Sequence, residues 1–175
     1  EIIYGFRSQI VAAEQVREHL LDVVQDVIYG RAEELDDEED SLAALATWVN
    51  SNFPIGFHPK QVVRDEGRRG RQRVDAAATA QAIFERVRKA YADKCSLEDP
   101  TQLNSMERFI MLNAVDTQWQ EYLRNMDTLR QGVGLRAYGQ RDPLVEYKNE
   151  AYTLFADLMD RIKAEIAGRI FRATT

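Results

Sequence analysis

Apolar side chains recur at alternating spacings of three and four residues in two long stretches of the second half of the chain. The first stretch contains Leu112, Val115, Trp119, Tyr122, Met126 and Leu129, and the second contains Leu144, Tyr147, Ala151, Leu154, Leu158 and Ile162. This spacing places the apolar groups on one face of a helix. Two such faces joined by a short connection predict a helical hairpin. We expect its seam at Trp119, Met126, Leu154 and Leu158.

The connection between these two helices has marked ends. Gly132 can adopt a left-handed conformation that ends the first helix, and Asp142 followed by Pro143 is typical of an N-cap with proline at the first helical position. Residues 133–141 mix apolar and polar groups without periodicity, namely Val133, Leu135, Arg136, Tyr138, Gln140 and Arg141. Either these residues contact another molecule, or the loop folds back and caps its own hairpin; the pattern leaves both open.

The beginning of the chain carries the same helical spacing. Its apolar residues are Ile3, Phe6, Ile10, Ala13, Val16, Leu20, Val24 and Val27. They predict one helix from Glu1 to about Tyr29 that stops near Gly30. Because no initiator Met and no capping residue precede the pattern, we expect this helix to be cut from a longer chain.

The middle of the chain predicts a smaller module. A short helix is expected from about residue 41 to 50, a proline-containing link at 53–59, and a longer helix from about 75 to 92. The longer helix places one face of apolar groups together, at Ala80, Ile83, Val87 and Tyr91. The acidic run 33–40 is best interpreted as an exposed connection.

The limits of the hairpin follow from similar signals. Asn104 or Ser105 is expected to cap its first helix, which runs to Gln131, and its second helix is expected to continue to about Arg169. Nothing in the sequence favours a sheet. The predicted fold class is therefore all-α, with a long first helix, a small inserted helical module and a helical hairpin.

Composition agrees with a mostly helical and elongated protein. The 175 residues are 30% charged, with only nine Gly and four Pro. A single cysteine, Cys95, cannot form an internal disulfide, and no signal peptide or long apolar span is present. A reducing, cytosolic setting is the simplest interpretation.

Charge argues against a nucleic-acid partner, because the formal net charge is −6. One basic cluster runs against this trend, comprising Arg64, Arg68, Arg69, Arg71 and Arg73. The cluster contains Gly67 and Gly70 but no interleaved aromatic residues. A solvated loop is therefore favoured over a surface that contacts phosphates.

The residue inventory predicts no catalytic, cofactor-binding or metal-binding residues in this chain. The two histidines, His19 and His58, are far apart, and no Cys/His pairing approaches zinc spacing. The run Gly132-Val133-Gly134 follows a helix and lacks the GK[ST] ending of a phosphate loop. Pairs such as Asp157 with Arg161 have the spacing of solvated ion pairs on a helix.

The region from Val115 to Phe155 carries a specific order of residues. They are Val115, Asp116, Trp119, Leu123, Met126, Asp127, Leu129, Arg130, Gly132, Leu135, Arg136, Tyr138, Gln140, Asp142, Pro143, Glu146, Tyr147, Lys148, Glu150 and Phe155. In this order and spacing the region resembles the two-helix finger and helical scaffold of SecA, the ATP-driven motor of bacterial preprotein export. The chain departs from the family at Tyr122, Gly139 and Ala151-Tyr152, where the family often has His, Ala and Gly-Phe. The segment Ile2 to Arg7 also resembles the family's scaffold helix shortly before its wing domain.

The resemblance implies a division into three parts: 1–30 as the end of the long scaffold helix, 31–103 as the helical wing, and 104–175 as the scaffold hairpin or two-helix finger. It also implies that Leu135, Arg136 and Tyr138 at the finger tip contact unfolded preprotein at the mouth of the SecY channel complex.

In the family, ATP and Mg are bound by nucleotide-binding domains of the same chain, which lie outside these 175 residues. The isolated chain is thus expected to be inactive as an ATPase. The resemblance further implies a cytoplasmic protein, peripherally associated with the cytoplasmic face of the bacterial inner membrane.

A different class of protein fits the residue pattern as well. The chain could be a non-enzymatic helical adaptor, or a structural module that binds a partner protein without any motor. Nucleotide-binding motifs upstream of Glu1 in the full-length gene would discriminate between the two, since only the motor requires them.

Overall fold

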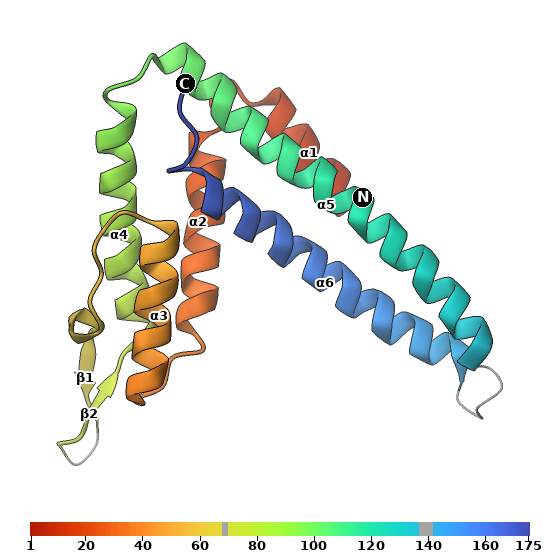
Figure 1. The fold of residues 1–175 in the computed structure, drawn as a ribbon, viewed down its shortest axis with the longest axis horizontal. Coiled ribbons are helices and arrows are strands. Elements are labelled where there is room, and N and C mark those ends of the chain that lie inside the picture. Colours follow the sequence, from red (N-terminus) through yellow and green to blue (C-terminus); the bar gives the residue numbers. More distant parts are fainter. Residues whose placement is uncertain (68–69, 137–141) are drawn as a thin grey trace.

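The computed structural model describes residues 1–67, 70–136 and 142–175, and helices account for 76% of these described residues. The helices form two arms that meet at one end (Figure 1). The long arm consists of α1 (Ile2–Ala12), α5 (Pro100–Arg136) and α6 (Pro143–Arg169). The short arm consists of α2 (Arg17–Ala32), α3 (Glu39–Asn52) and α4 (Ala76–Cys95). This architecture confirms the predicted all-α fold class.

The hydrophobic core lies where the arms meet. Helix α2 packs against α4 on one side and against α6 on the other. Fully buried side chains from α2 and α6 include Leu20, Val24, Ile28, Ile162, Ile166 and Ile170. Because each such side chain contributes roughly 1.5–3 kcal/mol by leaving water, this junction is strongly stabilised. The long arm extends away from it as a free hairpin (Figure 1).

The prediction of one continuous helix at the beginning of the chain is wrong. The structure has α1 and α2 with a break at residues 13–16, and α1 lies beside α5 (Figure 1). Gly30 does not stop the second of these helices, which continues to Ala32. The local pattern extended through the break because residues 13–16 contain no glycine or proline. The break therefore has a tertiary cause, described below.

The middle module contains a small sheet that the sequence did not predict. After the 3-10 turn Pro59–Gln61, strands β1 (Arg64–Glu66) and β2 (Gln72–Val74) pair antiparallel, with Asp65 opposite Arg73. Arg64, Arg71 and Arg73 are exposed on this hairpin, while Arg68 and Arg69 lie outside the described residues. Strands of three residues are too short to produce a clear alternating pattern.

The helices of the middle module agree with prediction. Helix α3 extends the expected 41–50 by two residues at each end. Helix α4 begins at Ala76 because the side chain of Asp75 accepts a hydrogen bond from the Ala78 N–H at 3.0 Å.

The long hairpin is confirmed, but two of its expected limits are wrong. Helix α5 begins at Pro100, where the carboxylate of Asp99 accepts hydrogen bonds from the N–H groups of residues 101 and 102, both at 3.0 Å. Asn104 and Ser105 therefore lie inside the helix. Gly132 does not end it either: the helix passes through to Arg136, and the positive-φ glycines among the described residues are Gly56 and Gly70.

The beginning of α6 follows the prediction. Asp142 caps the helix by accepting a hydrogen bond from the Leu144 N–H at 3.0 Å, with Pro143 at the first helical position. The helix continues to Arg169, as expected.

Candidate functional site

The far end of the long hairpin is the first candidate site, because the sequence placed its functional residues there. Leu135 and Arg136 belong to the last turn of α5, where the structure describes their backbone. Tyr138 lies outside the described residues. The structure thus brings Leu135 and Arg136 to the end of the hairpin, and the contact predicted for all three residues stays a prediction.

The hairpin seam is tight near the junction and open toward the tip. Leu158 is buried at 3% exposure, whereas Trp119, Met126 and Leu154 are only half-buried. Farther out, an open groove of about 550 Å³ separates the helices, lined by Asn125, Thr128, Leu129, Gly132, Glu150, Thr153 and Leu154. Small side chains at Thr128, Gly132 and Thr153 leave this space unfilled. Of the four predicted seam residues, the structure thus buries Leu158 and leaves the other three half-buried.

Large apolar side chains are exposed along the same outer half. They are Leu123 on α5 and Leu144, Val145 and Tyr152 on α6. Leu144 belonged to the predicted buried stripe, yet it is 59% exposed. An apolar surface beside an open groove is typical of a region that contacts other molecules.

Aromatic rings tie the three helices of the long arm together midway along it. Trp119 and Tyr122 on α5 stack with centroids 5.3 Å apart. Tyr4 on α1 meets Trp119 edge-on at 6.3 Å, and Phe155 on α6 meets Tyr122 edge-on at 6.3 Å. These edge and stacked geometries are favourable for aromatic pairs, so they connect α1 to the hairpin.

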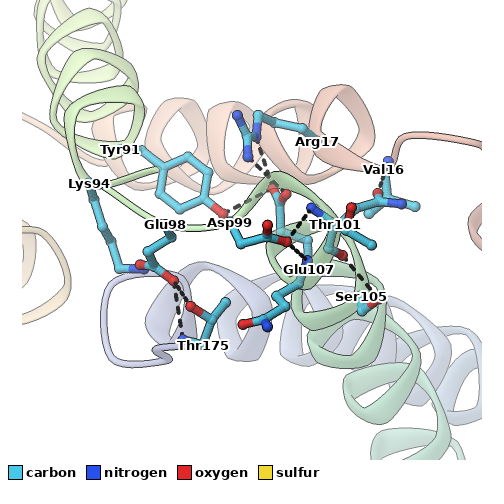
Figure 2. Close-up of polar contacts among 12 residues, drawn as sticks. Val16, Arg17, Tyr91, Lys94, Glu98, Asp99, Thr101, Ser105, Glu107 and Thr175 are labelled. Atoms are coloured by element: carbon cyan, nitrogen blue, oxygen red, sulfur yellow. Dashed lines mark hydrogen bonds and ion pairs between the residues drawn. The ribbon is translucent and has the colours of Figure 1, made fainter. Parts of the chain in front are cut away.

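The second candidate site is a polar joint at the junction of the arms. The carboxylate of Glu107 on α5 is 1% exposed and accepts two hydrogen bonds from the Arg17 guanidinium on α2, at 3.1 and 3.2 Å. It also accepts a hydrogen bond from the Tyr91 hydroxyl on α4 at 3.0 Å. Figure 2 shows these side chains converging from the three helices. One buried carboxylate thereby joins the long arm to two helices of the short arm.

Electrostatics keep the two hydrogen-bond donors of the joint, Tyr91 and Arg17, protonated. Burial raises the pKa of the Tyr91 phenol well above its usual value, and the nearby Glu107 charge raises it further. The phenol therefore stays protonated and keeps donating. The hydrogen bond to Glu107 raises the pKa of Arg17, and burial raises the pKa of the Cys95 thiol, so that thiol is poorly ionised.

A second group of α5 side chains binds the break between α1 and α2. The Arg108 guanidinium donates to the carbonyl oxygens of Ile10 and Val11 at 2.6 and 2.9 Å. It also donates to those of Ala13 and Glu14 at 2.5 and 3.4 Å. Asn104 donates to the Glu14 carbonyl at 2.9 Å and accepts from the Val16 N–H at 3.3 Å. We call Asn104 and Arg108 the α5 clamp.

Sequence reasoning missed the joint and the clamp. A signal for Glu107 exists, since it lies four residues after Leu103 and three before Ile110, on the face that α5 buries. A charged residue on such a face requires a partner. Arg108 and Asn104 carry no comparable signal, because their acceptors are backbone carbonyls more than 85 residues away.

A third polar contact fastens the end of the chain to the turn between α4 and α5. The Glu98 carboxylate accepts hydrogen bonds from Lys94 at 2.6 Å and from the N–H and hydroxyl of Thr175 at 3.1 and 2.7 Å (Figure 2). These hydrogen bonds, with that from Lys94 the largest cause, lower the pKa of Glu98 to about 2.

We predict an unusually acidic titration at Glu98. A lowered pKa means that the folded state favours the carboxylate, so this stabilisation is present above the ordinary Glu pKa of about 4.3 and is lost as the pH falls toward about 2. Carboxyl NMR should show Glu98 still ionised at about pH 3.5. In Lys94→Ala the same carboxyl should titrate at a higher pH; an unchanged midpoint would show that Lys94 does not cause the shift.

The three polar sites consist of hydrogen bonds and ion pairs between packed elements. Within the described segments, no group of three or more His, Cys, Asp and Glu residues is arranged to hold a metal ion. None of the helices there combines the length and apolarity needed to cross a membrane. An open polar hollow of about 500 Å³ lies against the joint, lined by Glu14, Gln15, Arg17, Pro100, Thr101, Asn104 and Glu107.

These features define a helical scaffold: a long hairpin, a shorter arm, and a polar joint between them. A family model described as the SecA wing and scaffold domain matches residues 1–174. The chain belongs to this SecA wing and scaffold family.

Individual relatives agree with the family match. The protein translocase subunit SecA 1 of Mycobacterium bovis is 34% identical over 182 residues, which cover 99% of this chain and 19% of the relative. The protein translocase subunit SecA of a Nocardioides species is 34% identical over 175 residues, covering 98% of this chain and 18% of the relative. The chain therefore spans about a fifth of the length of the curated relatives it matches.

Proposed function

We propose that the chain is the wing and scaffold part of an ATP-driven motor that moves preproteins through the SecY channel. In this proposal, nucleotide-binding domains elsewhere in a longer protein hold ATP and Mg, and the scaffold transmits their movement. The motor acts in the cytoplasm at the face of the inner membrane. Family membership supports the proposal, as does the name of the relatives, protein translocase subunit SecA.

The geometry of the hairpin is the observation that carries this proposal. Helix α5 has 37 residues, which at about 1.5 Å per residue gives a rod of about 55 Å. Its base is embedded in the core at the junction, while its other end projects far from the short arm (Figure 1). A rod held rigidly at one end can carry a small rotation to a distant contact.

The tip residues Leu135, Arg136 and Tyr138 are the proposed contacts with unfolded preprotein at the channel mouth. A tyrosine ring has an apolar face and a polar end, which suits contacts with many different sequences. Leu144 and Val145, which are exposed in the first turn of α6, add to this surface. The scaffold, wing and finger division near residues 30 and 103 is part of the same proposal.

The proposal predicts that Tyr138→Ala impairs transport without unfolding the protein. In the full-length protein, the variant should reduce preprotein translocation into SecY-containing vesicles several-fold while leaving the melting temperature within about 1–2 °C, as expected if the ring contacts preprotein rather than the rest of the chain. Tyr138→Phe should retain more activity because it keeps the ring. A crosslinker at position 138 should capture preprotein or the channel.

Tyr152→Ala is the matched control, because Tyr152 is a 77% exposed tyrosine on the same hairpin, away from its end. Transport by this variant should stay close to wild type. If Tyr138→Ala lowers stability and a crosslinker at position 138 reaches only the hairpin, the loop instead caps its own hairpin. A full-length protein that binds no ATP analogue would favour the helical adaptor instead.

A further inference from the structure

The break between α1 and α2 occurs in a sequence that favours helix. Residues 13–16 are Ala13, Glu14, Gln15 and Val16, with no proline or glycine among them. Alanine, glutamate and glutamine are good helix formers. The apolar spacing of three and four also continues across the break, from Ile10 to Leu20. Local preferences therefore favour a continuous helix, and something else imposes the bend.

The α5 clamp supplies hydrogen-bond donors in place of those that the bend removes. In a continuous helix the carbonyls of residues 10, 11, 13 and 14 would accept from the N–H groups of residues 14, 15, 17 and 18. In the structure these four carbonyls accept from the Arg108 guanidinium instead. Asn104 adds a donor for the Glu14 carbonyl and an acceptor for the Val16 N–H. Without these side chains the bend would leave several backbone carbonyls, some of them at exposed positions, with water as their donor.

The carbonyls of this segment can thus accept hydrogen bonds in two ways. Their donors are either backbone N–H groups of a continuous helix or side chains of α5. We propose that residues 2–32 form a two-state element, bent while the α5 clamp is engaged and a single straight helix once it is released. Straightening swings α1 away from α5 and re-aims it relative to the short arm. It is a conformational device independent of what the hairpin tip contacts.

Other contacts of α1 determine which state dominates. Ile3 and Ile10 are buried, Arg7 forms an ion pair with Asp116 at 3.0 Å, and Tyr4 meets Trp119. The ion pair is largely exposed and contributes little. Burial of the two isoleucines favours packing of α1 against α5 and therefore the bent form. The clamp sets the size of the free-energy difference between the bent and the straight form.

A distance measurement across the bend tests the proposal. Gly5 and Gly30 are exposed helical positions where an added side chain meets no atom within 4 Å, so both accept a spin label. In a continuous helix they are about 38 Å apart along the axis, and any bend shortens this distance. Pulsed EPR would use Gly5→Cys/Gly30→Cys in a Cys95→Ala background of the chain.

The clamped chain should give one distance shorter than about 38 Å. Asn104→Ala/Arg108→Ala should add a population near about 38 Å, together with a gain of roughly four helical residues by circular dichroism. Adding Gln15→Gly to that variant should return the short distance, because glycine disfavours the helix needed for the straight form. Arg124→Ala is the matched control, since Arg124 is an exposed α5 arginine paired with Glu121.

Two outcomes would overturn the two-state bend. One is an unchanged short distance in the Asn104→Ala/Arg108→Ala variant. The other is a broad distribution with lost helix, which would mean that the clamp only prevents local unfolding. A long-distance population in the Arg124→Ala control would show that the effect is not specific to the clamp.

Discussion

Leu158→Asp should lower the free energy of unfolding by about 4 kcal/mol, the largest effect we expect from a single change in the hairpin. Leu158 lies on α6 in the hydrophobic core and is 3% exposed. The substitution removes its apolar contacts and places a carboxylate among the buried apolar side chains of the core. Chemical denaturation monitored by circular dichroism measures the loss.

Asp157→Ala is the control for this prediction. Asp157 is the preceding residue on the same helix but is exposed, so its replacement should cost about 0.5 kcal/mol or less. The pair separates burial from helix propensity because both positions lie in the interior of α6. Equal losses for the two variants would contradict the placement of Leu158 in the core.

Glu107→Ala should lower the free energy of unfolding by about 2–3 kcal/mol. This is less than the loss of a fully buried ion pair, because the Arg17 side chain is 40% exposed. The loss arises mainly from the Tyr91 hydroxyl, which is left buried without its acceptor, and from the bidentate pair with Arg17. The melting temperature should fall accordingly, and exchange of amide hydrogens should accelerate first where α2, α4 and α5 meet.

Two variants refine the interpretation of this result. Glu107→Gln keeps an acceptor for Tyr91 and should retain part of the stability. Arg7→Ala removes the exposed ion pair with Asp116 and should cost about 0.5 kcal/mol. If Glu107→Ala were no more harmful than Arg7→Ala, the polar joint would contribute nothing beyond a surface pair.

Whether a site residue could be predicted from the sequence depends on how far along the chain its partners lie. The order of residues around the hairpin connection was sufficient to identify the SecA family, which the family match confirms. The same residues placed Leu135 and Arg136 at the end of the hairpin. Glu107 and Arg108 were missed because their partners come from helices distant in the sequence, and only packing reveals them.

Sequence alone determined the features that depend on neighbouring residues. Asp75 and Asp142 begin their helices because each side chain accepts a hydrogen bond from a backbone N–H two or three residues ahead. Apolar periodicity likewise predicted the two hairpin helices, since a helix repeats every 3.6 residues wherever it packs.

Tertiary structure decided the features in which local preferences are weak or opposed. Gly132 lies within α5 because a glycine costs a helix only about 1 kcal/mol, less than the contacts along the hairpin supply. The bend at residues 13–16 goes against helix-forming residues because Arg108 and Asn104, more than 85 positions away, satisfy its carbonyls. Helix preferences amount to tenths of a kcal/mol per residue, so hydrogen bonds from another helix, together with the burial of Ile3 and Ile10, override them.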